Sequence, residues 1–105
     1  MKDIIDGKRY DTDTAEEIAT GSSSGAHPGD FEYYREILYK TDNGAWFLAG
    51  KGGPKTKYAS PVPGGGLSGG SGIHPLTSGE TMSWMEAHSR LRALEKHFPD
   101  EIEDA

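Results

Sequence analysis

The sequence predicts an α+β fold: a small antiparallel sheet of two hairpins, packed by a long C-terminal helix, with a short N-terminal helix. Three observations support this prediction. Asp6-Gly7 and Asn43-Gly44 are typical of tight hairpin turns, and each lies between short strand-like runs. Apolar residues recur at spacings of three and four late in the chain, as on one face of a helix. A chain of 105 residues is the size of one domain, so we expect residues 1–105 to form a single domain.

The first two elements are predicted from turn and capping residues. Asp6-Gly7 favours a type I′ turn, in which both central residues have positive φ. Asp13 with Glu16 has the spacing of a helix capping box, and so does the alternative pair, Thr14 with Glu17. We therefore expect a short helix over about residues 14–20, with acidic side chains in its first turn, where they favour the helix dipole.

The strongest local signal is the hairpin over residues 31–53, FEYYREILYKTDNGAWFLAGKGG. Asn43-Gly44 is expected to close a two-residue turn, which fixes the register and places Glu36 opposite Lys51 as a cross-strand ion pair. Because side chains alternate between faces, one face is expected to form the core. It carries Phe31, Tyr33, Arg35, Ile37, Tyr39, Trp46 and Leu48. The outer face carries Glu32, Tyr34, Glu36, Leu38, Lys40, Phe47, Ala49 and Lys51.

A glycine-rich run follows over residues 61–75, PVPGGGLSGGSGIHP. It contains the GxGxxG spacing of a dinucleotide fingerprint, beginning at Gly64. That fingerprint works only between a buried strand and a helix N-terminus, and prolines on both sides of Val62 argue against a buried strand here. No helix is expected directly after the run either. We predict a flexible loop over residues 61–75, with no bound nucleotide.

The long helix is predicted to begin at Thr77, which forms a capping box with Glu80, and to reach Pro99. Its apolar stripe consists of Trp84, Ala87, Leu91, Leu94 and Phe98. We expect the stripe to cover the core face of the second hairpin, in particular the part that bears Tyr33, Ile37 and Leu48. The acidic segment 100–105 follows.

The formal net charge of −6 is unevenly distributed: residues 1–36 carry −5, residues 37–79 carry +3 and residues 80–105 carry −4. This balance disfavours direct nucleic-acid binding and favours a basic protein partner. The chain has no cysteine, no signal-like apolar start and no run long enough to span a membrane. We therefore expect a cytoplasmic protein without disulfides and without membrane association.

No catalytic or metal-binding pattern is evident. The four histidines lack ligand spacing, and no serine lies in a nucleophile elbow. We predict a protein that is not an enzyme and that holds no metal and no cofactor. The enzymatic alternative, which would use the glycine-rich loop, lacks an ordered nucleophile and base.

Two charged surfaces are candidate sites, and for each the alternative is ordinary solvation. The first is acidic, and its expected partner-binding residues are Glu16, Glu17, Glu32, Tyr34, Glu36 and Phe47. Glu32 and Glu36 flank Tyr34, an amphipathic side chain of the kind enriched in interfaces. Acid around an aromatic ring fits a basic groove on another protein. The second surface, which fits a small anion or an acidic partner, consists of Lys51, Lys55, Lys57 and Tyr58.

Most of the chain resembles a set of small, mostly uncharacterised proteins of phages, integrative elements and bacterial chromosomes. The resemblance lies in GKRYDTDTAEEIA, DFEYYREILYKTDNGAWFLAGKGGPKTKYA, IHPLT and the closing FPDEIEDA. These motifs carry no chemistry of their own. Proteins of this kind often have an acidic residue where Lys51 stands, which implies that Lys51 is not essential to a shared function. Small acidic proteins of mobile elements include inhibitors of host defence, notably anti-CRISPR proteins.

The resemblance and the acidic surface together imply a non-catalytic inhibitor. It would bind a bacterial host defence complex, either a protein or a ribonucleoprotein, through the acidic surface. The alternative is a small accessory or regulatory module of a mobile element that binds a protein partner through the sheet face of Tyr34 and Phe47.

Overall fold

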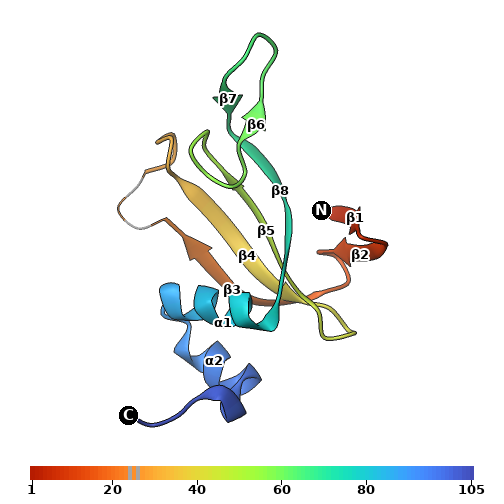
Figure 1. Cartoon of the computed structure of the whole chain (residues 1–105), viewed down its shortest axis with the longest axis vertical. Helices are drawn as coiled ribbons and strands as arrows, with labels where there is room; N and C mark the ends of the chain where they lie inside the picture. The colour runs from red at the N-terminus through yellow and green to blue at the C-terminus, as the bar shows by residue number, and fades with distance from the viewer. Residues whose placement is uncertain (24, 26) are drawn as a thin grey trace.

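The computed structural model describes every residue of the chain except Ser24 and Ala26. The fold is α+β, as predicted: short helices cover one face of a four-stranded antiparallel sheet, and a hairpin packs on the other (Figure 1). The sheet order is β3 (Glu16–Ser22), β4 (Tyr34–Lys40), β5 (Trp46–Gly52) and β8 (Gly70–Leu76). The remaining main elements are β1 (Lys2–Ile5), β2 (Lys8–Asp11), α1 (Ser78–Ala87), α2 (Leu91–His97) and the 3-10 turn η1 (Pro99–Glu101). In the part of the chain so described, no helix is both long and apolar enough to cross a membrane.

The short N-terminal helix predicted over residues 14–20 is wrong, because residues 16–22 form the edge strand β3 and residues 14 and 15 lie in the turn before it. A bulge between Glu17 and Ala19 lets Ile18 and Ala19 both pack against the core beneath the helices. Two consecutive apolar residues on one side of a strand hide its alternation and imitate helical spacing. Pairing with β4 along the whole strand then outweighs the local helix propensity.

The β4–β5 hairpin forms, but its register differs by one residue from the prediction. A type I′ turn needs positive φ at both central residues, whereas here only Gly44 has it, at 85°. The connection is therefore longer, with the Thr41 N–H donating to the Ala45 carbonyl at 2.8 Å. Lys40 pairs with Trp46 as the first strand partners.

This one-residue slip changes which β4 and β5 side chains share a face. Trp46 and Leu48 lie with Leu38 in the core beneath the helices. Ile37 and Tyr39, predicted to lie beneath the helix, lie on the opposite face. The predicted core face is therefore split between the two sides of the sheet.

The predicted long helix is also wrong, because the chain forms two short helices there. The capping box at the start of α1 is confirmed: Thr77 Oγ1 accepts from the Glu80 N–H at 3.1 Å, and Glu80 Oε1 accepts from the Thr77 N–H at 2.9 Å. The helix ends where Ser89 adopts a φ of 56°. Arg90 Nε donates to the Thr20 carbonyl at 2.8 Å and so ties the break to β3.

The break decides which residues of the predicted stripe reach the core. Trp84, Leu94 and Phe98 are buried, as predicted. Leu91 stands first in α2, just after the break, and is 62% exposed. Ala87, the last residue of α1 and also part of the predicted stripe, is exposed too. The apolar stripe therefore identifies three buried residues correctly and is wrong for the two that lie next to the break.

The β1–β2 hairpin covers the second face of the sheet. Asp6 and Gly7 have φ values of 52° and 75°, which confirms the predicted type I′ turn. The buried cluster beneath the hairpin consists of Tyr10, Tyr39, Phe47, Ala49 and Ile73. Tyr39 stacks on Phe47 with ring centroids 5.1 Å apart, and Tyr10 meets the same ring edge-on at 5.4 Å.

The glycine-rich run is only partly a loop. Gly70–Leu76 is the edge strand β8, which pairs with β5, so the predicted loop is wrong for residues 70–75. Before it, β6 (Ser60–Pro61) and β7 (Leu67–Ser68) form a small hairpin that projects from the sheet (Figure 1). This β6–β7 finger carries no charged residue between positions 60 and 70.

Candidate functional site

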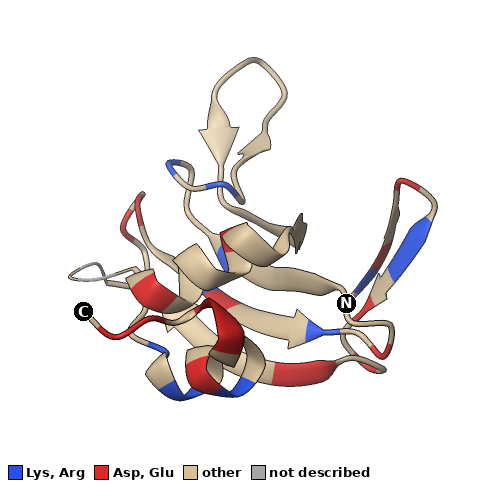
Figure 2. Ribbon diagram, turned by 60° about the horizontal axis from the view of Figure 1, so that its bottom comes forward, with Lys and Arg blue, Asp and Glu red and all other residues tan. Residues whose placement is uncertain are grey.

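The six residues predicted to bind a partner do not form one surface. Glu16 and Glu17 are exposed at the start of β3. Glu32 is exposed just before the start of β4, at the other end of the β3–β4 pair, and its carboxylate lies 3.7 Å from Lys55 Nζ. Acidic residues are therefore present at both ends of the β3–β4 pair and not in a single patch. In the ribbon of Figure 2, acidic positions are likewise spread over several parts of the chain.

The other three predicted site residues belong wholly or partly to the interior. Phe47 is fully buried beneath the β1–β2 hairpin, and Glu36 is 1% exposed. Tyr34 is half-buried and lies on the opposite face of the sheet from Phe47. The exposed Tyr34–Phe47 sheet face, on which the accessory-module alternative depended, therefore does not exist.

Glu36 is the centre of a buried hydrogen-bond network. Trp84 Nε1 donates to Glu36 Oε1 at 2.8 Å, and the Tyr58 hydroxyl donates to Glu36 Oε2 at 2.6 Å. Lys57 Nζ lies 2.9 Å from Oε2 and 3.2 Å from Oε1. These groups come from β4, from α1 and from the segment between β5 and β6. The buried carboxylate is therefore paired and fully hydrogen-bonded, and it joins three separate parts of the chain.

Glycines in register with Glu36 make room for this network. Gly21 of β3 and Gly50 of β5 are its partners on either side, and we call these two glycines the glycine row. A Cβ on Gly21 would lie 2.6 Å from Trp84 Cζ2, and a Cβ on Gly50 would lie 2.5 Å from the Tyr58 hydroxyl. Any side chain in the row would push the two aromatic donors away from the carboxylate.

His88 completes the network at its edge. The Trp84 carbonyl can only accept, so His88 Nδ1 donates to it at 2.9 Å. In the neutral ring, Nε2 then accepts from the Tyr34 hydroxyl at 3.1 Å. Both ring nitrogens of His88 are thus engaged in structural bonds. Among the described residues, no three His, Cys, Asp or Glu side chains cluster as a metal site would require.

The network shifts the pKa values of its two acidic members in opposite directions. Burial raises the pKa of Glu36, but hydrogen bonds from Tyr58, Trp84 and Lys57 and the Lys57 charge outweigh it, so the pKa lies below its ordinary value of 4.5. Burial and the hydrogen bond to the Glu36 carboxylate raise the pKa of Tyr58 far above its ordinary value of 10.0. At neutral pH the carboxylate is therefore ionised and the phenol is protonated, as the hydrogen bond between them requires.

We expect the free energy of unfolding to fall in acid partly through Glu36. Its folded pKa is below the unfolded value of 4.5, so its contribution is complete above that value and is lost as the pH falls through the folded pKa. Denaturant titrations between about pH 3 and pH 7 should show a shallower acid limb for Glu36→Gln than for the wild type. Parallel limbs in the two proteins would mean that this carboxylate does not control acid stability.

A second candidate site, the acidic groove, lies between the two helices and the chain after them. It has a volume of about 310 Å³. Its apolar lining is Met82, Leu91, Leu94 and Ile102, and its carboxylates are Glu86, Glu95, Glu101 and Glu103. Leu91 and Ile102 are 62% and 44% exposed. Exposed apolar side chains with a polar rim are typical of interaction sites.

The predicted basic patch is also divided. Lys55 pairs with Glu32, and Lys57 pairs with the buried Glu36. Lys51 is exposed on β5 opposite Arg35, so the predicted Glu36–Lys51 pair does not form. The patch therefore comprises one surface ion pair, one part of the buried network and one separate lysine.

Sequence reasoning missed both the network and the acidic groove. The acids of segment 100–105 were visible as a charged run, but Glu86 and Glu95 come close to them only because the chain turns at Ser89. The network depends on the strand register, which the turn dipeptide alone did not fix. No protein-family model, curated protein or solved structure matches the chain.

Proposed function

We propose that this chain is a non-catalytic binding protein whose acidic groove takes a basic segment of a partner protein. The observation that carries the proposal is the combination, in one groove, of an apolar floor and four carboxylates. An aliphatic or aromatic side chain of the partner would fill the floor beside Leu91 and Ile102. Lysine or arginine residues next to it would reach the carboxylates and fix its orientation.

The resemblance to small proteins of mobile elements suggests the kind of partner. Protein surfaces that hold DNA or RNA are basic, and an acidic ligand can occupy them in place of the nucleic acid. The proposed partner is therefore the nucleic-acid-binding surface of a bacterial defence complex, and the proposed effect is inhibition. Direct contact with nucleic acid is not required, and the net charge of −6 opposes it.

We expect the triple variant Glu86→Lys/Glu95→Lys/Glu101→Lys to lose inhibition. The assay is target-DNA binding by purified CRISPR effector complexes loaded with guide RNA, together with phage plating on strains that carry them. Each of these side chains is exposed, so reversal should change the free energy of unfolding by only about 0–1 kcal/mol per site. Inhibition by the wild type should weaken as salt is raised, because exposed charges are screened.

The matched control is Glu16→Lys/Glu17→Lys/Glu32→Lys, which changes the net charge by the same amount at the surface predicted from sequence. It should still inhibit. Loss of inhibition in the control alone would mean that the partner binds at Glu16, Glu17 or Glu32 instead of at the acidic groove. Equal loss in both variants would indicate that inhibition depends on net charge only. A wild-type chain that inhibits none of the complexes would overturn the anti-defence proposal.

A further inference from the structure

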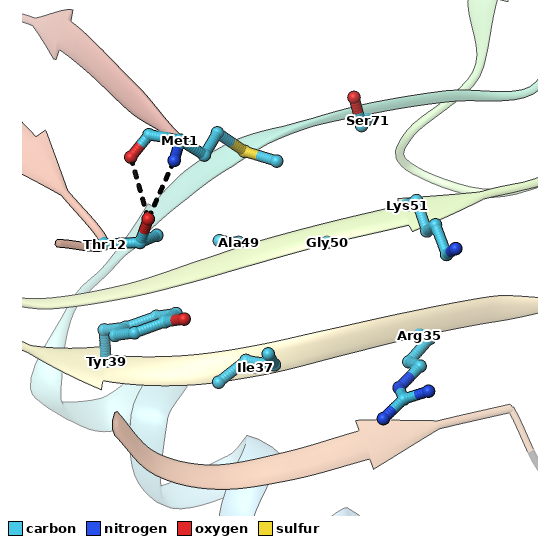
Figure 3. Close-up of a pocket in the computed structure, with 9 residues that line it drawn as sticks. All are labelled: Met1, Thr12, Arg35, Ile37, Tyr39, Ala49, Gly50, Lys51 and Ser71. Atoms are coloured by element: carbon cyan, nitrogen blue, oxygen red, sulfur yellow. Dashed lines mark hydrogen bonds between the residues drawn. The ribbon is translucent and has the colours of Figure 1, made fainter. Parts of the chain in front are cut away.

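A second groove lies on the opposite face of the sheet, beside the β1–β2 hairpin (Figure 3). It has a volume of about 380 Å³, within the range of small-molecule sites. The lining residues that matter here are Met1, Arg35, Ile37, Tyr39, Ala49 and Lys51. We call it the sheet groove. It shares no residue with the acidic groove.

One end of the sheet groove is cationic. Arg35 of β4 and Lys51 of β5 are register partners, and both are exposed. Among the described residues, neither lies in a salt bridge, whereas Lys55 and Lys57 each do. Like charges directly opposite one another destabilise a sheet, so an anion between them would relieve the repulsion. No acidic residue lines the groove in the described part of the chain.

The floor of the groove is apolar, whereas its other end combines the Met1 side chain with polar groups, among them the N-terminal ammonium, which donates to Thr12 Oγ1 at 2.8 Å. Ile37 and Ala49 are the next pair on this face, and they form the floor beside the two cations. Met1 and Tyr39 lie toward the opposite end, and the Tyr39 hydroxyl points toward the cations (Figure 3). Burial and nearby acidic residues raise the pKa of Tyr39, so its phenol remains protonated and can donate a hydrogen bond.

We infer that the sheet groove binds a small amphipathic carboxylate. The carboxylate lies between Arg35 and Lys51, where the guanidinium can hold it through two hydrogen bonds. The apolar body lies on Ile37 and Ala49 and extends toward Met1. This activity is separate from the proposed function, because it uses the other face of the sheet and the opposite sign of charge.

The test is a titration of the whole chain with 2-naphthoate, followed by calorimetry and by backbone amide chemical shifts. We expect saturable binding, with shift changes confined to the sheet groove. Arg35→Gln/Lys51→Gln should weaken binding at least about tenfold, because each charged hydrogen bond contributes that much or more. These substitutions remove a like-charge pair, so the variant should fold with equal or higher thermal stability.

The matched control is Lys8→Gln/Arg92→Gln, which changes the net charge equally at exposed positions outside the groove and should bind like the wild type. The neutral 2-naphthamide should bind much more weakly than 2-naphthoate. Equal binding of the amide and the acid, equal loss in both variants, or shift changes elsewhere would overturn the inference. Binding of an extended acidic peptide in place of 2-naphthoate would make the groove a protein-docking surface and would also overturn it.

Discussion

We expect Trp84→Ala to lower the free energy of unfolding by about 3–5 kcal/mol, the range for truncating a buried aromatic residue. The ring is 7% exposed and belongs to the core with Leu38 and Leu48. It also supplies one of the donors to Glu36, so truncation leaves both a cavity and a less satisfied buried carboxylate. Denaturant titration at neutral pH, monitored by far-UV circular dichroism, would measure the loss.

Two further variants separate the parts of this effect. Trp84→Phe keeps most of the ring but removes the N–H, and we expect a loss of about 1–3 kcal/mol from the missing hydrogen bond. Leu91→Ala is the matched control, because the apolar stripe predicts it to be as buried as Trp84. Its 62% exposure predicts a change within about 0.5 kcal/mol. A loss as large as that of Trp84→Ala would favour one continuous helix.

Glu36→Ala is expected to be nearly as damaging, at about 3–5 kcal/mol. The substitution removes the acceptor for Trp84 Nε1 and the Tyr58 hydroxyl and leaves a cavity between them. The side chain of Lys57 is 40% exposed and can turn to water, so it adds little to the loss. The same measurement applies, with the melting temperature as a second readout.

The control for Glu36→Ala is Glu32→Ala. Both glutamates are predicted from sequence to be exposed members of one acidic surface, yet the Glu32 side chain is 64% exposed and pairs only with an exposed lysine. Its truncation should cost about 0–1 kcal/mol. Similar effects of the two substitutions would contradict the buried network.

The features that local sequence could predict are those that local chemistry determines. The Asp6-Gly7 turn and the capping box at Thr77 are correct, because each depends on residues within a few positions of one another. The α+β class and the existence of the β4–β5 hairpin follow from the same short-range signals, whereas the two edge strands, β3 and β8, do not, and the β1–β2 hairpin is separate from the four-stranded sheet. Burial of Trp84 and Phe98 was also predictable, since each lies on an apolar stripe within its own part of the chain.

The features that sequence did not predict depend on contacts between distant segments. Strand β3 exists because β4 offers it a full set of partners, and its bulge conceals the alternation that would have identified it. No glycine or proline marks the break between the two helices in the sequence. The break is stabilised by a hydrogen bond from the Arg90 side chain to the carbonyl of Thr20, which is distant in sequence. The β4–β5 register changed with one residue of turn length, and this moved Glu36 from the predicted surface into the core.

The glycine row limits which substitutions this chain can accept in evolution. Gly21 and Gly50 can acquire a side chain only if the aromatic donors beside them withdraw, and Glu36 would then keep a buried charge without its partners. We therefore expect substitutions at these three positions to depend on one another in evolution, although the positions lie far apart in the chain. Gly72 extends the same line into β8, but a Cβ there would meet nothing within 4 Å, so this position is free to drift. Among diverged relatives of this chain, Gly21 and Gly50 should therefore be retained together with Glu36 more often than Gly72 is retained.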